Sequence, residues 1–168
     1  MARIVVDAVR PRPDVLQLRY QASGLIGDLK FPKTKTPART DGLWRHTCFE
    51  AFVRAGSDAG YSEFNLSPSG AWAAYRFGGY RDKITPIGDI STPAIEVRRS
   101  VDSIEFKAEF ELAGAGLPVD QLWLVGLSAV IEETSGRLSY WALKHPAGEP
   151  DFHHVDCFAV ELAPPLRP

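Results

Sequence analysis

The sequence predicts an all-β protein, a β-sandwich of two antiparallel sheets with about ten strands and little helix. Short runs in which apolar and polar residues alternate recur along the chain, which is the pattern of strands with one buried face. The 14 glycines and 13 prolines are scattered between these runs rather than clustered, as expected of many turns. The 168 residues, 45% of them hydrophobic, suit one globular domain that spans residues 1–168.

The clearest strand is Ser103–Glu111, in which apolar and charged residues alternate strictly. One face is apolar and the other charged: Ile104, Phe106, Ala108 and Phe110 against Glu105, Lys107, Glu109 and Glu111. Ile95–Arg99 alternates more weakly, and Val101–Ser103 supplies turn residues between the two runs. The two runs together predict an antiparallel hairpin.

Eight further segments are predicted strands by the same reasoning. They are Arg3–Val9, Val15–Ala22, Thr47–Arg54, Ser62–Leu66, Ala71–Phe77, Gln121–Glu132, Arg137–Leu143 and Cys157–Leu162. The middle of Gln121–Glu132 is apolar on both faces, which predicts a strand covered on both sides. Short helical turns fit at residues 24–29 and 113–117. The polar segment Asp28–Asp41 predicts a long surface loop, a type of segment that often carries function.

Charge and composition argue against several classes of partner. The 19 basic and 21 acidic residues give a net charge of -2 without a basic run, so we expect no nucleic-acid partner. Residues Met1–Asp7 are too short an apolar stretch for a signal peptide, and no segment is long and apolar enough to span a membrane. These observations favour a cytoplasmic protein. The two cysteines, Cys48 and Cys157, are not in a CxxC spacing, which favours free buried thiols over a disulfide.

The apolar pattern of residues 47–77 predicts which side chains share a sheet face. If Phe49 pairs with Leu66 across the first two strands, Glu50 lies opposite Asn65. By the same register, Ala51 lies near Phe64, and Phe52 lies opposite Glu63. The next turn, at residues 67–70, is predicted to place Ala71 opposite Leu66. That register sets Asn65 against Trp72, and Tyr61 against Arg76.

This register predicts a polar patch on the face that points away from the core. Its members are Glu50, Glu63, Asn65, Trp72 and Arg76. Carboxylate, amide and guanidinium groups bind sugar hydroxyls, and an indole ring packs against the C–H face of a sugar. The alternative is an ordinary solvated sheet face in which Glu63 and Arg76 form a weak ion pair. An exposed Trp72 is the feature that this alternative explains least well.

The segment Ser139–Phe158 holds a second group of candidate residues. Trp141, His145, Asp151 and His153 could line a ligand site. A metal site formed by His145, Asp151, His153 and His154, with His46 from farther away in the chain, is a second interpretation, but the spacing matches no zinc pattern. A third is a loop braced by hydrogen bonds from His153 or Asp151 to backbone amides, which we consider somewhat more favoured than direct ligand contact.

Signals for catalysis are weak, so a non-catalytic protein is favoured, with no cofactor and no metal. There is no GxSxG motif, no cysteine in an activating context and no glycine-rich phosphate loop. Glu50 and Glu63 could act as a glycosidase pair, being carboxylates on neighbouring strands. Nothing in the sequence separates their pKa values, so this remains the lesser interpretation.

The sequence resembles the DOMON-like domains related to family 9 carbohydrate-binding modules. The resemblance covers most of the chain and rests on these segments: Leu43–Trp44, Cys48–Phe52, Tyr61–Trp72, Tyr75, Phe77, Tyr80–Arg81, Tyr140–Leu143 and Pro150–His153. It implies a β-sandwich with a ligand site on or beside one sheet. In sugar-binding relatives, aromatic rings clamp a saccharide while polar side chains bind its hydroxyls, and the patch from Glu50 to Arg76 matches in residue type.

The function expected from these observations is binding of a saccharide or a similar polyhydroxylated small molecule. One alternative is a metal- or haem-dependent redox or enzymatic protein that uses the His145–His154 loop. Cytochrome-like relatives hold b-type haem between methionine and histidine ligands, whereas the only methionine here is Met1. Another alternative is a protein-interaction module whose exposed aromatic residues anchor a partner.

Overall fold

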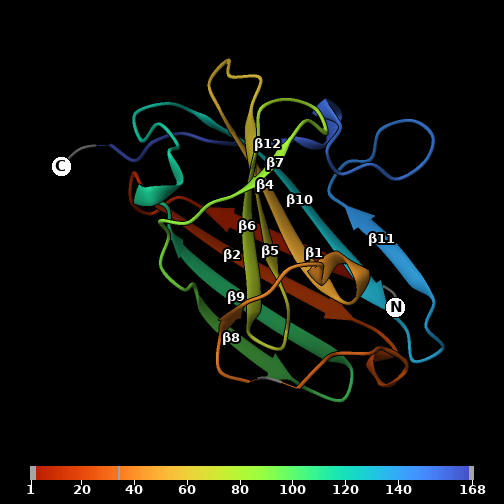
Figure 1. Ribbon diagram of the computed structural model, residues 1–168. Coiled ribbons are helices and arrows are strands. Elements are labelled where there is room, and N and C mark those ends of the chain that lie inside the picture. The colour runs from red at the N-terminus through yellow and green to blue at the C-terminus, as the bar shows by residue number, and fades with distance from the viewer. Residues whose placement is uncertain (1–2, 34, 167–168) are drawn as a thin grey trace.

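The computed structural model describes residues 3–33 and 35–166, and its strands form two sheets that pack as a sandwich (Figure 1). One sheet has four strands in the order β1-β2-β9-β8. The other has eight, in the order β11-β10-β4-β5-β6-β3, with β12 paired to β10 and β7 to β6. The predicted all-β sandwich with little helix is therefore confirmed.

The strands have the following bounds. They are β1 (Arg3–Val9), β2 (Val15–Ser23), β3 (Ala38–Arg39), β4 (Cys48–Ala55), β5 (Tyr61–Leu66), β6 (Ala71–Phe77), β7 (Ile84–Pro86), β8 (Ala94–Arg99), β9 (Ser103–Glu111), β10 (Trp123–Glu132), β11 (Leu138–Ala142) and β12 (Val160–Leu162). The described residues also form four three-residue 3-10 turns, at Ile26–Asp28, Leu43–Arg45, Ala113–Ala115 and Val155–Cys157. No helix in residues 3–33 and 35–166 is long and apolar enough to cross a membrane.

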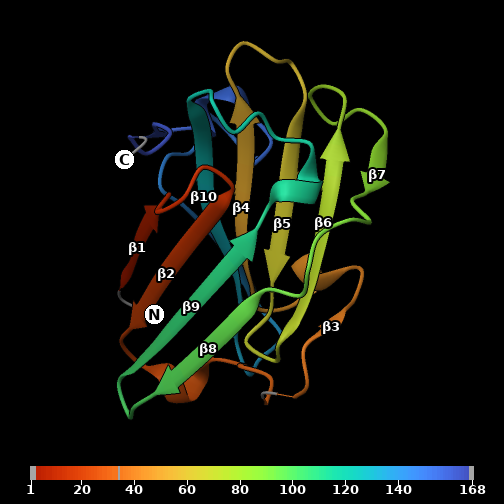
Figure 2. The same ribbon diagram turned by 90° about the vertical axis from the view of Figure 1, so that its left-hand side faces the viewer.

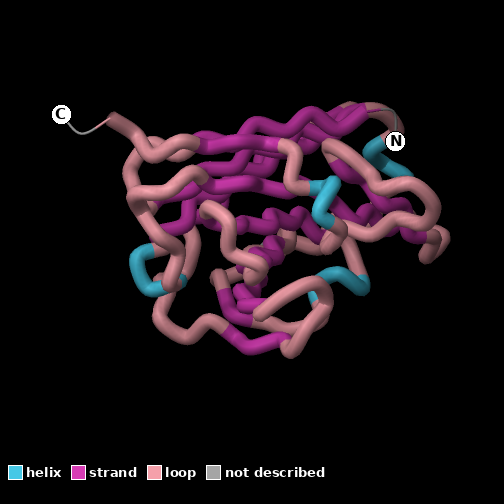
Figure 3. The backbone as a smooth tube through the Cα atoms, turned by 90° about the horizontal axis from the view of Figure 1, so that it is seen from above, coloured by secondary structure: helices cyan, strands magenta, loops and turns pink. Residues whose placement is uncertain are grey.

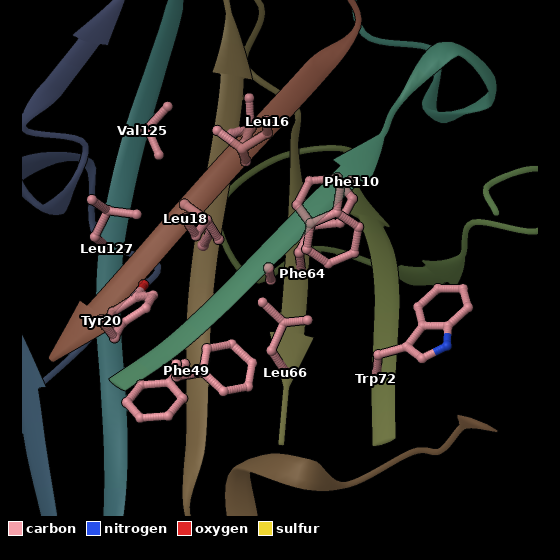
Figure 4. Packing of buried hydrophobic residues seen from close by; sticks show 14 of the residues in the cluster. Leu16, Leu18, Tyr20, Phe49, Phe64, Leu66, Trp72, Phe110, Val125 and Leu127 are labelled. Atoms are coloured by element: carbon pink, nitrogen blue, oxygen red, sulfur yellow. The ribbon is translucent and has the colours of Figure 1, made fainter. Parts of the chain in front are cut away.

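The hydrophobic core lies between the two sheets (Figures 2 and 4). Strand β9 buries its even-numbered residues and leaves its charged residues toward solvent, as the alternation predicts. It pairs with β8 in the predicted hairpin. Across the interface, Phe49 of β4 packs on Phe106 with ring centroids 4.8 Å apart, and Phe64 packs on Phe110 at 5.0 Å. These contacts show that the side chains of Phe49 and Phe64 point toward the four-stranded sheet. The residues that alternate with them on β4 and β5 therefore point away from it.

The outward face of the eight-stranded sheet is also covered, which explains why its central strands are buried on both sides. Nine of the ten residues of β10 are buried, as its apolar character predicts. Loops and short turns lie around the strand layers when the molecule is viewed from above (Figure 3). One close approach is made at Gly126, where an added Cβ would stand 3.1 Å from the carbonyl oxygen of Cys157. Glycine is needed there because the turn at residues 155–157 lies directly on the strand.

Several local expectations require adjustment. The segment Asp28–Asp41 is largely loop, but Ala38–Arg39 forms β3, which pairs in parallel with β6. The sheets are therefore antiparallel except at this one short pairing among the described residues. The predicted strand Cys157–Leu162 begins only at Val160, because the chain first forms the 3-10 turn over β10. Both cysteines are free and buried, as predicted.

The predicted register of β4 and β5 is confirmed, but that of β5 and β6 is wrong by one residue. Phe49 pairs with Leu66 and Glu50 with Asn65. In the next hairpin, however, Leu66 pairs with Trp72, and Asn65 pairs with Ala73. Side chains alternate with a period of two, so a slip of one residue turns every side chain of β6 to the opposite face.

The turn between β5 and β6 explains this slip. The amide of Ser67 donates to the carbonyl oxygen of Ala71 at 2.8 Å, so the two residues pair and only three residues form the loop. Gly70 closes this loop with a φ of 91°, a conformation that few residues other than glycine adopt. The sequence pattern predicts a four-residue turn at residues 67–70 instead. The three-residue loop brings Trp72 into the core between the sheets, where it is 3% exposed.

Candidate functional site

A cavity of about 460 Å³ lies on the outer face of the eight-stranded sheet, the face that points away from the four-stranded sheet. Loops that follow β6 and β11, together with the turn before β4, supply its walls. Its lining residues are Trp44, Glu50, Glu63, Phe77, Arg81, Asp82, Ile84, Val130, Tyr140, Pro150, Phe152 and His153. A second cluster of buried apolar residues surrounds this region, separate from the core between the sheets.

Two buried carboxyl groups form the floor of the cavity. Glu50 lies on β4 and Glu63 on β5, and they are only 3% and 5% exposed. The hydroxyl of Ser128, on β10, donates to Glu50 Oε2 at 3.3 Å. The amide of Asn65 donates from Nδ2 to Glu63 Oε1 at 2.6 Å. Each carboxyl group is therefore held through one of its two oxygens. Ser128 on the adjacent strand β10 holds Glu50, and Asn65 on the same strand β5 holds Glu63.

Two acceptor oxygens in this floor have no hydrogen-bond partner. They are Oε1 of Glu50 and Oδ1 of Asn65, both buried. Buried polar atoms in proteins nearly always have a partner, because an unpaired one costs about 1–3 kcal/mol. Since Glu50 lines the cavity, a bound molecule can supply the donor that its Oε1 lacks. An oxygen that is buried without a partner distinguishes this sheet face from an ordinary solvated one, whose polar groups bond to water.

Burial disfavours the charged form of both carboxyl groups. Burial, with the nearby charge of Glu63, raises the pKa of Glu50 to about 8, although hydrogen bonds from Ser128 and Cys48 act against this. Burial raises the pKa of Glu63 to about 7, against the opposing effects of Asn65 and of the positive charge of Arg81. The two groups repel each other when both are ionised, so their titrations are coupled.

His153 stands beside Glu63 in a largely apolar setting. Its Nε2 lies 3.9 Å from Glu63 Oε2, and its Nδ1 lies 2.8 Å from the hydroxyl of Tyr61. The rings of Phe52 and Phe77 meet its ring edge-on, at centroid distances of 5.0 and 5.1 Å. Burial, followed by the positive charge of Arg81, lowers the pKa of His153 to about 4. The imidazole is therefore neutral at physiological pH.

The hydrogen bonds of Tyr61 indicate which tautomer His153 adopts. The hydroxyl oxygen of Tyr61 accepts from the amide of Arg81 at 3.3 Å, and this arrangement favours donation of its own hydrogen to Nδ1 of His153. A neutral imidazole that accepts at Nδ1 carries its proton at Nε2. The Nε2–H group therefore faces Glu63, the carboxyl group at the cavity floor.

Asp151 ties the loop that follows β11 to the loop that follows β6. Its carboxylate accepts hydrogen bonds from the hydroxyl of Tyr80, from the guanidinium of Arg81 at 2.7 Å and from the amide of His153 at 3.1 Å. Burial alone would raise the pKa of Asp151, but the bonds from Tyr80 and Arg81 outweigh it, so this pKa lies below its ordinary value. The predicted bracing of the loop by Asp151 is confirmed.

Aromatic side chains form the apolar part of the cavity wall. Trp44 and Tyr140 are 39% and 48% exposed, which places them where the cavity meets solvent. Trp44 meets Tyr75 edge-on at 6.2 Å, and the hydroxyl of Tyr75 is fixed by Asp41 at 2.6 Å. Phe77 and Phe152 are mostly buried deeper in the wall. Flat apolar surfaces thus stand beside a polar floor.

The structure brings together five of the nine residues that the sequence analysis proposed. Glu50, Glu63 and His153 line the cavity, Asn65 holds Glu63, and Asp151 braces the wall. Whether these residues bind a ligand stays a prediction.

Four predicted residues lie elsewhere. Trp72 is in the core because of the register slip, with the guanidinium of Arg39 over its ring at 4.3 Å. Arg76 shares the core-side register of Trp72 and pairs with Asp58 at 2.9 Å, not with Glu63. Trp141 pairs with Ala129, whose side chain belongs to the core between the sheets, so its indole is on the inner face.

His145 is exposed and has no place among the residues that line the cavity. Its ring lies 6.1 Å from that of Phe152. Of the other histidines considered as metal ligands, His46 contacts Glu132 at 2.8 Å, and His154 accepts from the amide of Asp156 at 3.2 Å. Within residues 3–33 and 35–166, no three His, Cys, Asp or Glu side chains group in a way that could hold a metal ion.

Several site residues were not proposed from the sequence. The most important are Trp44, Arg81, Ser128, Tyr140 and Phe152. All except Ser128 lie within the segments that carry the family resemblance, which was the available signal. Ser128 is a lone hydroxyl in an apolar strand, and strand pairing with Glu50 is what shows its role.

A cavity of similar volume, about 470 Å³, lies on the outer face of the four-stranded sheet. Its charged side chains already have partners on the same surface: Gln17 donates to Glu109 at 2.5 Å, and Arg19 donates to Glu105 at 2.5 and 2.8 Å. No unpaired buried polar side chain is found among its lining residues. The cavity over Glu50 and Glu63 is therefore the stronger candidate site.

Comparison with known proteins supports the architecture. No family model and no curated protein matches the chain. Among solved structures, the chain is similar to one from Bacteroides uniformis ATCC 8492, described as a "putative carbohydrate-binding protein". The similarity covers 95% of this chain and 77% of the other, with a TM-score of 0.61 and 12% sequence identity. At this level of identity, the comparison establishes a shared fold.

Proposed function

We propose that the cavity on the outer face of the eight-stranded sheet binds a saccharide or a similar polyhydroxylated small molecule, without catalysing a reaction. The observation that carries this proposal is the unpaired, buried Oε1 of Glu50 at the floor of an aromatic-walled cavity. Support also comes from the fold shared with the Bacteroides protein and from the resemblance to DOMON-like domains related to family 9 carbohydrate-binding modules.

The chemistry of the cavity suits a sugar ring. Hydroxyl groups of the ligand donate to Glu50 Oε1, and Glu50 and Glu63 can donate in turn while they are protonated. The Nε2–H group of His153 offers a further donor. Trp44 and Tyr140 present apolar rings to the C–H face of a sugar. Pockets of this size, with apolar walls and a few fixed polar groups, are typical of small-molecule sites.

A glycan array followed by calorimetry tests this function. The wild-type protein is expected to bind at least one glycan, and Trp44→Ala is expected to weaken binding about tenfold or more, the usual effect of removing a central aromatic contact. Leu25→Ala is the control, because Leu25 is exposed and belongs neither to the cavity nor to its walls. Absence of binding to every glycan by the wild-type protein would exclude the proposal, as would full affinity in Trp44→Ala.

The raised pKa values of Glu50 and Glu63 favour a second candidate function, glycoside hydrolysis. A carboxyl group that stays protonated near neutral pH is what a glycosidase needs as its acid. Chromogenic glycosides distinguish the two functions. Hydrolysis that is lost in both Glu50→Gln and Glu63→Gln would establish catalysis, whereas binding without hydrolysis leaves the protein a binding module.

A further inference from the structure

The floor of the cavity has two carboxyl groups, and the side chains that the structure describes around them offer no unpaired cation. Within residues 3–33 and 35–166, Glu50 has no ion-pair partner, and Glu63 has only His153, at 3.9 Å. His153 is neutral at physiological pH, for the reasons given above. Arg81 also lines the cavity, but its guanidinium is paired with Asp151 at 2.7 Å. Asp82 adds a further acidic group to the lining.

Six titratable side chains in the described part of the chain act on the two carboxyl groups. Each comes from a different strand or loop, and they are Tyr20, Cys48, Tyr61, Tyr75, Arg81 and His153. The tyrosines and the cysteine are neutral at physiological pH, because burial raises the pKa of each. The surroundings therefore supply no positive charge beyond that of Arg81, which Asp151 balances.

The unpaired oxygen lacks a donor, and an ammonium group can supply one. Glu50 Oε1 is buried and accepts no hydrogen bond in the structure. An ammonium group has three N–H donors and no acceptor, so it can bond to several carboxyl oxygens without leaving a lone pair unmatched. A hydrogen bond in which one partner is ionised is also about twice as strong as a neutral one, so an ammonium donor has this advantage even while the carboxyl groups keep their protons.

The aromatic walls favour an organic cation over a metal ion. Trp44, Phe77, Tyr140 and Phe152 surround the polar floor, and aromatic ring faces attract ammonium groups. A calcium ion needs six to eight oxygen ligands, whereas these walls offer carbon surfaces. The floor itself supplies the oxygens of only two carboxyl groups.

We infer that the ligand of this cavity carries a protonated amine, which narrows the saccharide class to amino sugars. This inference rests on the proposed function and deepens it. The ammonium group lies between Glu50 and Glu63, and the sugar ring extends toward Trp44 and Tyr140. An N-acetylated sugar lacks the charge, and a plain hydroxyl supplies one donor in place of three.

The test uses an array that carries each glycan in matched amino, N-acetylamino and hydroxyl forms. The smallest set is glucosamine, N-acetylglucosamine and glucose, and chitosan and chitin oligosaccharides extend it. The amino member of a bound set is expected to bind about tenfold tighter than its matched partners, the effect of exchanging a charged hydrogen bond for a neutral one. Calorimetry on the best set then measures each affinity.

Glu50→Gln supplies the decisive variant, because glutamine keeps an acceptor oxygen but cannot release a proton to match the charge of an ammonium group. It is expected to lose the preference for the amino sugar while retaining most affinity for the hydroxyl form. The control is Glu111→Gln, which removes an exposed carboxylate on the other sheet. Unfolding curves establish that each variant is folded. If Glu50→Gln fails to fold, Glu63→Gln takes its place.

Each outcome decides between the two proposals. A preference for the amino form that disappears in Glu50→Gln supports both. Equal or better binding of the neutral forms overturns the amino-sugar inference and leaves saccharide binding intact. Failure of every glycan to bind overturns both. A titration with calcium chloride completes the test, because stoichiometric calcium binding that Glu50→Gln abolishes would make the floor a metal site and overturn the inference.

Discussion

The hydroxyl oxygen of Tyr61 lies 2.8 Å from Nδ1 of His153, and this contact joins the sheet to the loop that walls the cavity. Tyr61 is part of β5, two residues before Glu63, whereas His153 follows the sharp turn after β11. The contact at Nδ1 orients the imidazole so that Nε2 faces Glu63, and a phenol that donates to Nδ1 leaves the ring proton on Nε2. The position of His153 in the cavity wall thus depends on Tyr61, which lies 92 positions earlier in the chain.

Removal of this hydroxyl is expected to loosen the wall of the cavity. Tyr61→Phe keeps the ring, which stacks on Phe77 at 4.9 Å, and loses the bonds to His153 and Arg81. The free energy of unfolding should fall by about 1–3 kcal/mol, because two partners are left unpaired in a partly buried place. Urea denaturation measures the change. Tyr140→Phe serves as the control, since it removes an exposed hydroxyl, and an equal loss in both variants would contradict the prediction.

Stability should depend on pH through Glu50. Its pKa is raised from 4.5 to about 8 in the folded protein, so the folded state retains a proton that the unfolded chain loses. The resulting stabilisation is complete below pH 4.5 and disappears as pH rises to about 8. Glu63 acts in the same direction up to about pH 7. His153, with a lowered pKa, acts in the opposite direction and costs stability as pH falls from 6.5 to about 4.

Glu50→Gln isolates the first of these effects. At pH 8 the variant should be more stable than the wild-type protein by about 1 kcal/mol or more, because it buries no group that must ionise. Near pH 4.5 the difference should vanish. Chemical denaturation at several pH values measures it, with Glu111→Gln as an exposed control. An unchanged difference between pH 4.5 and 8 would show that Glu50 titrates normally.

Trp72 should behave as a core residue. Its side chain packs between the sheets, so Trp72→Ala should lower the free energy of unfolding by about 3–5 kcal/mol. Trp44→Ala, at the mouth of the cavity, should cost only about 1 kcal/mol, because Trp44 is substantially exposed. Thermal or urea unfolding compares the two. If Trp72→Ala lowers the free energy of unfolding only slightly, Trp72 is on the surface, as the sequence pattern predicts.

Gly70 should be intolerant of a side chain. Its φ of 91° strains any other residue, and an added Cβ would stand 2.9 Å from the carbonyl oxygen of Lys35. Gly70→Ala is therefore expected to cost about 1–3 kcal/mol in the free energy of unfolding. Gly79→Ala is the matched control, because nothing lies within 4 Å of its added Cβ. Equal stability of the two variants would mean that the hairpin turn differs from the three-residue loop.

The sequence predicted the structure well where apolar and polar residues alternate and the neighbouring strand is also evident from its pattern. The alternation in Ser103–Glu111 predicted its buried face, and the apolar residues of β4 and β5 predicted that Glu50 pairs with Asn65. The next register failed because it depended on the length of one turn. Ser67 can belong to the loop or pair with Ala71, and residue types alone do not distinguish the two.

The candidate site was predictable in its floor and not in its walls. Glu50, Glu63 and Asn65 share a sheet face through local pairing, which a sequence reveals. Trp44 reaches the cavity from the turn before β4 and Arg81 from the loop after β6, and only the packing of these segments on the sheet brings them there. The burial of Glu50 and Glu63 also depends on loop packing. Their sheet face looks polar and solvated in the sequence, but loops cover it in the fold.

By itself, the sequence determined the all-β class, the two-sheet sandwich, most strands and the pairing of Glu50 with Asn65. These features follow from residue alternation and from contacts between neighbouring strands. The tertiary structure alone decided that Trp72 belongs to the core, that Trp44 and Tyr140 border the cavity and that two carboxyl groups are removed from water. The physical reason is that burial depends on which other segments cover a residue. Local periodicity does not indicate which segments these are.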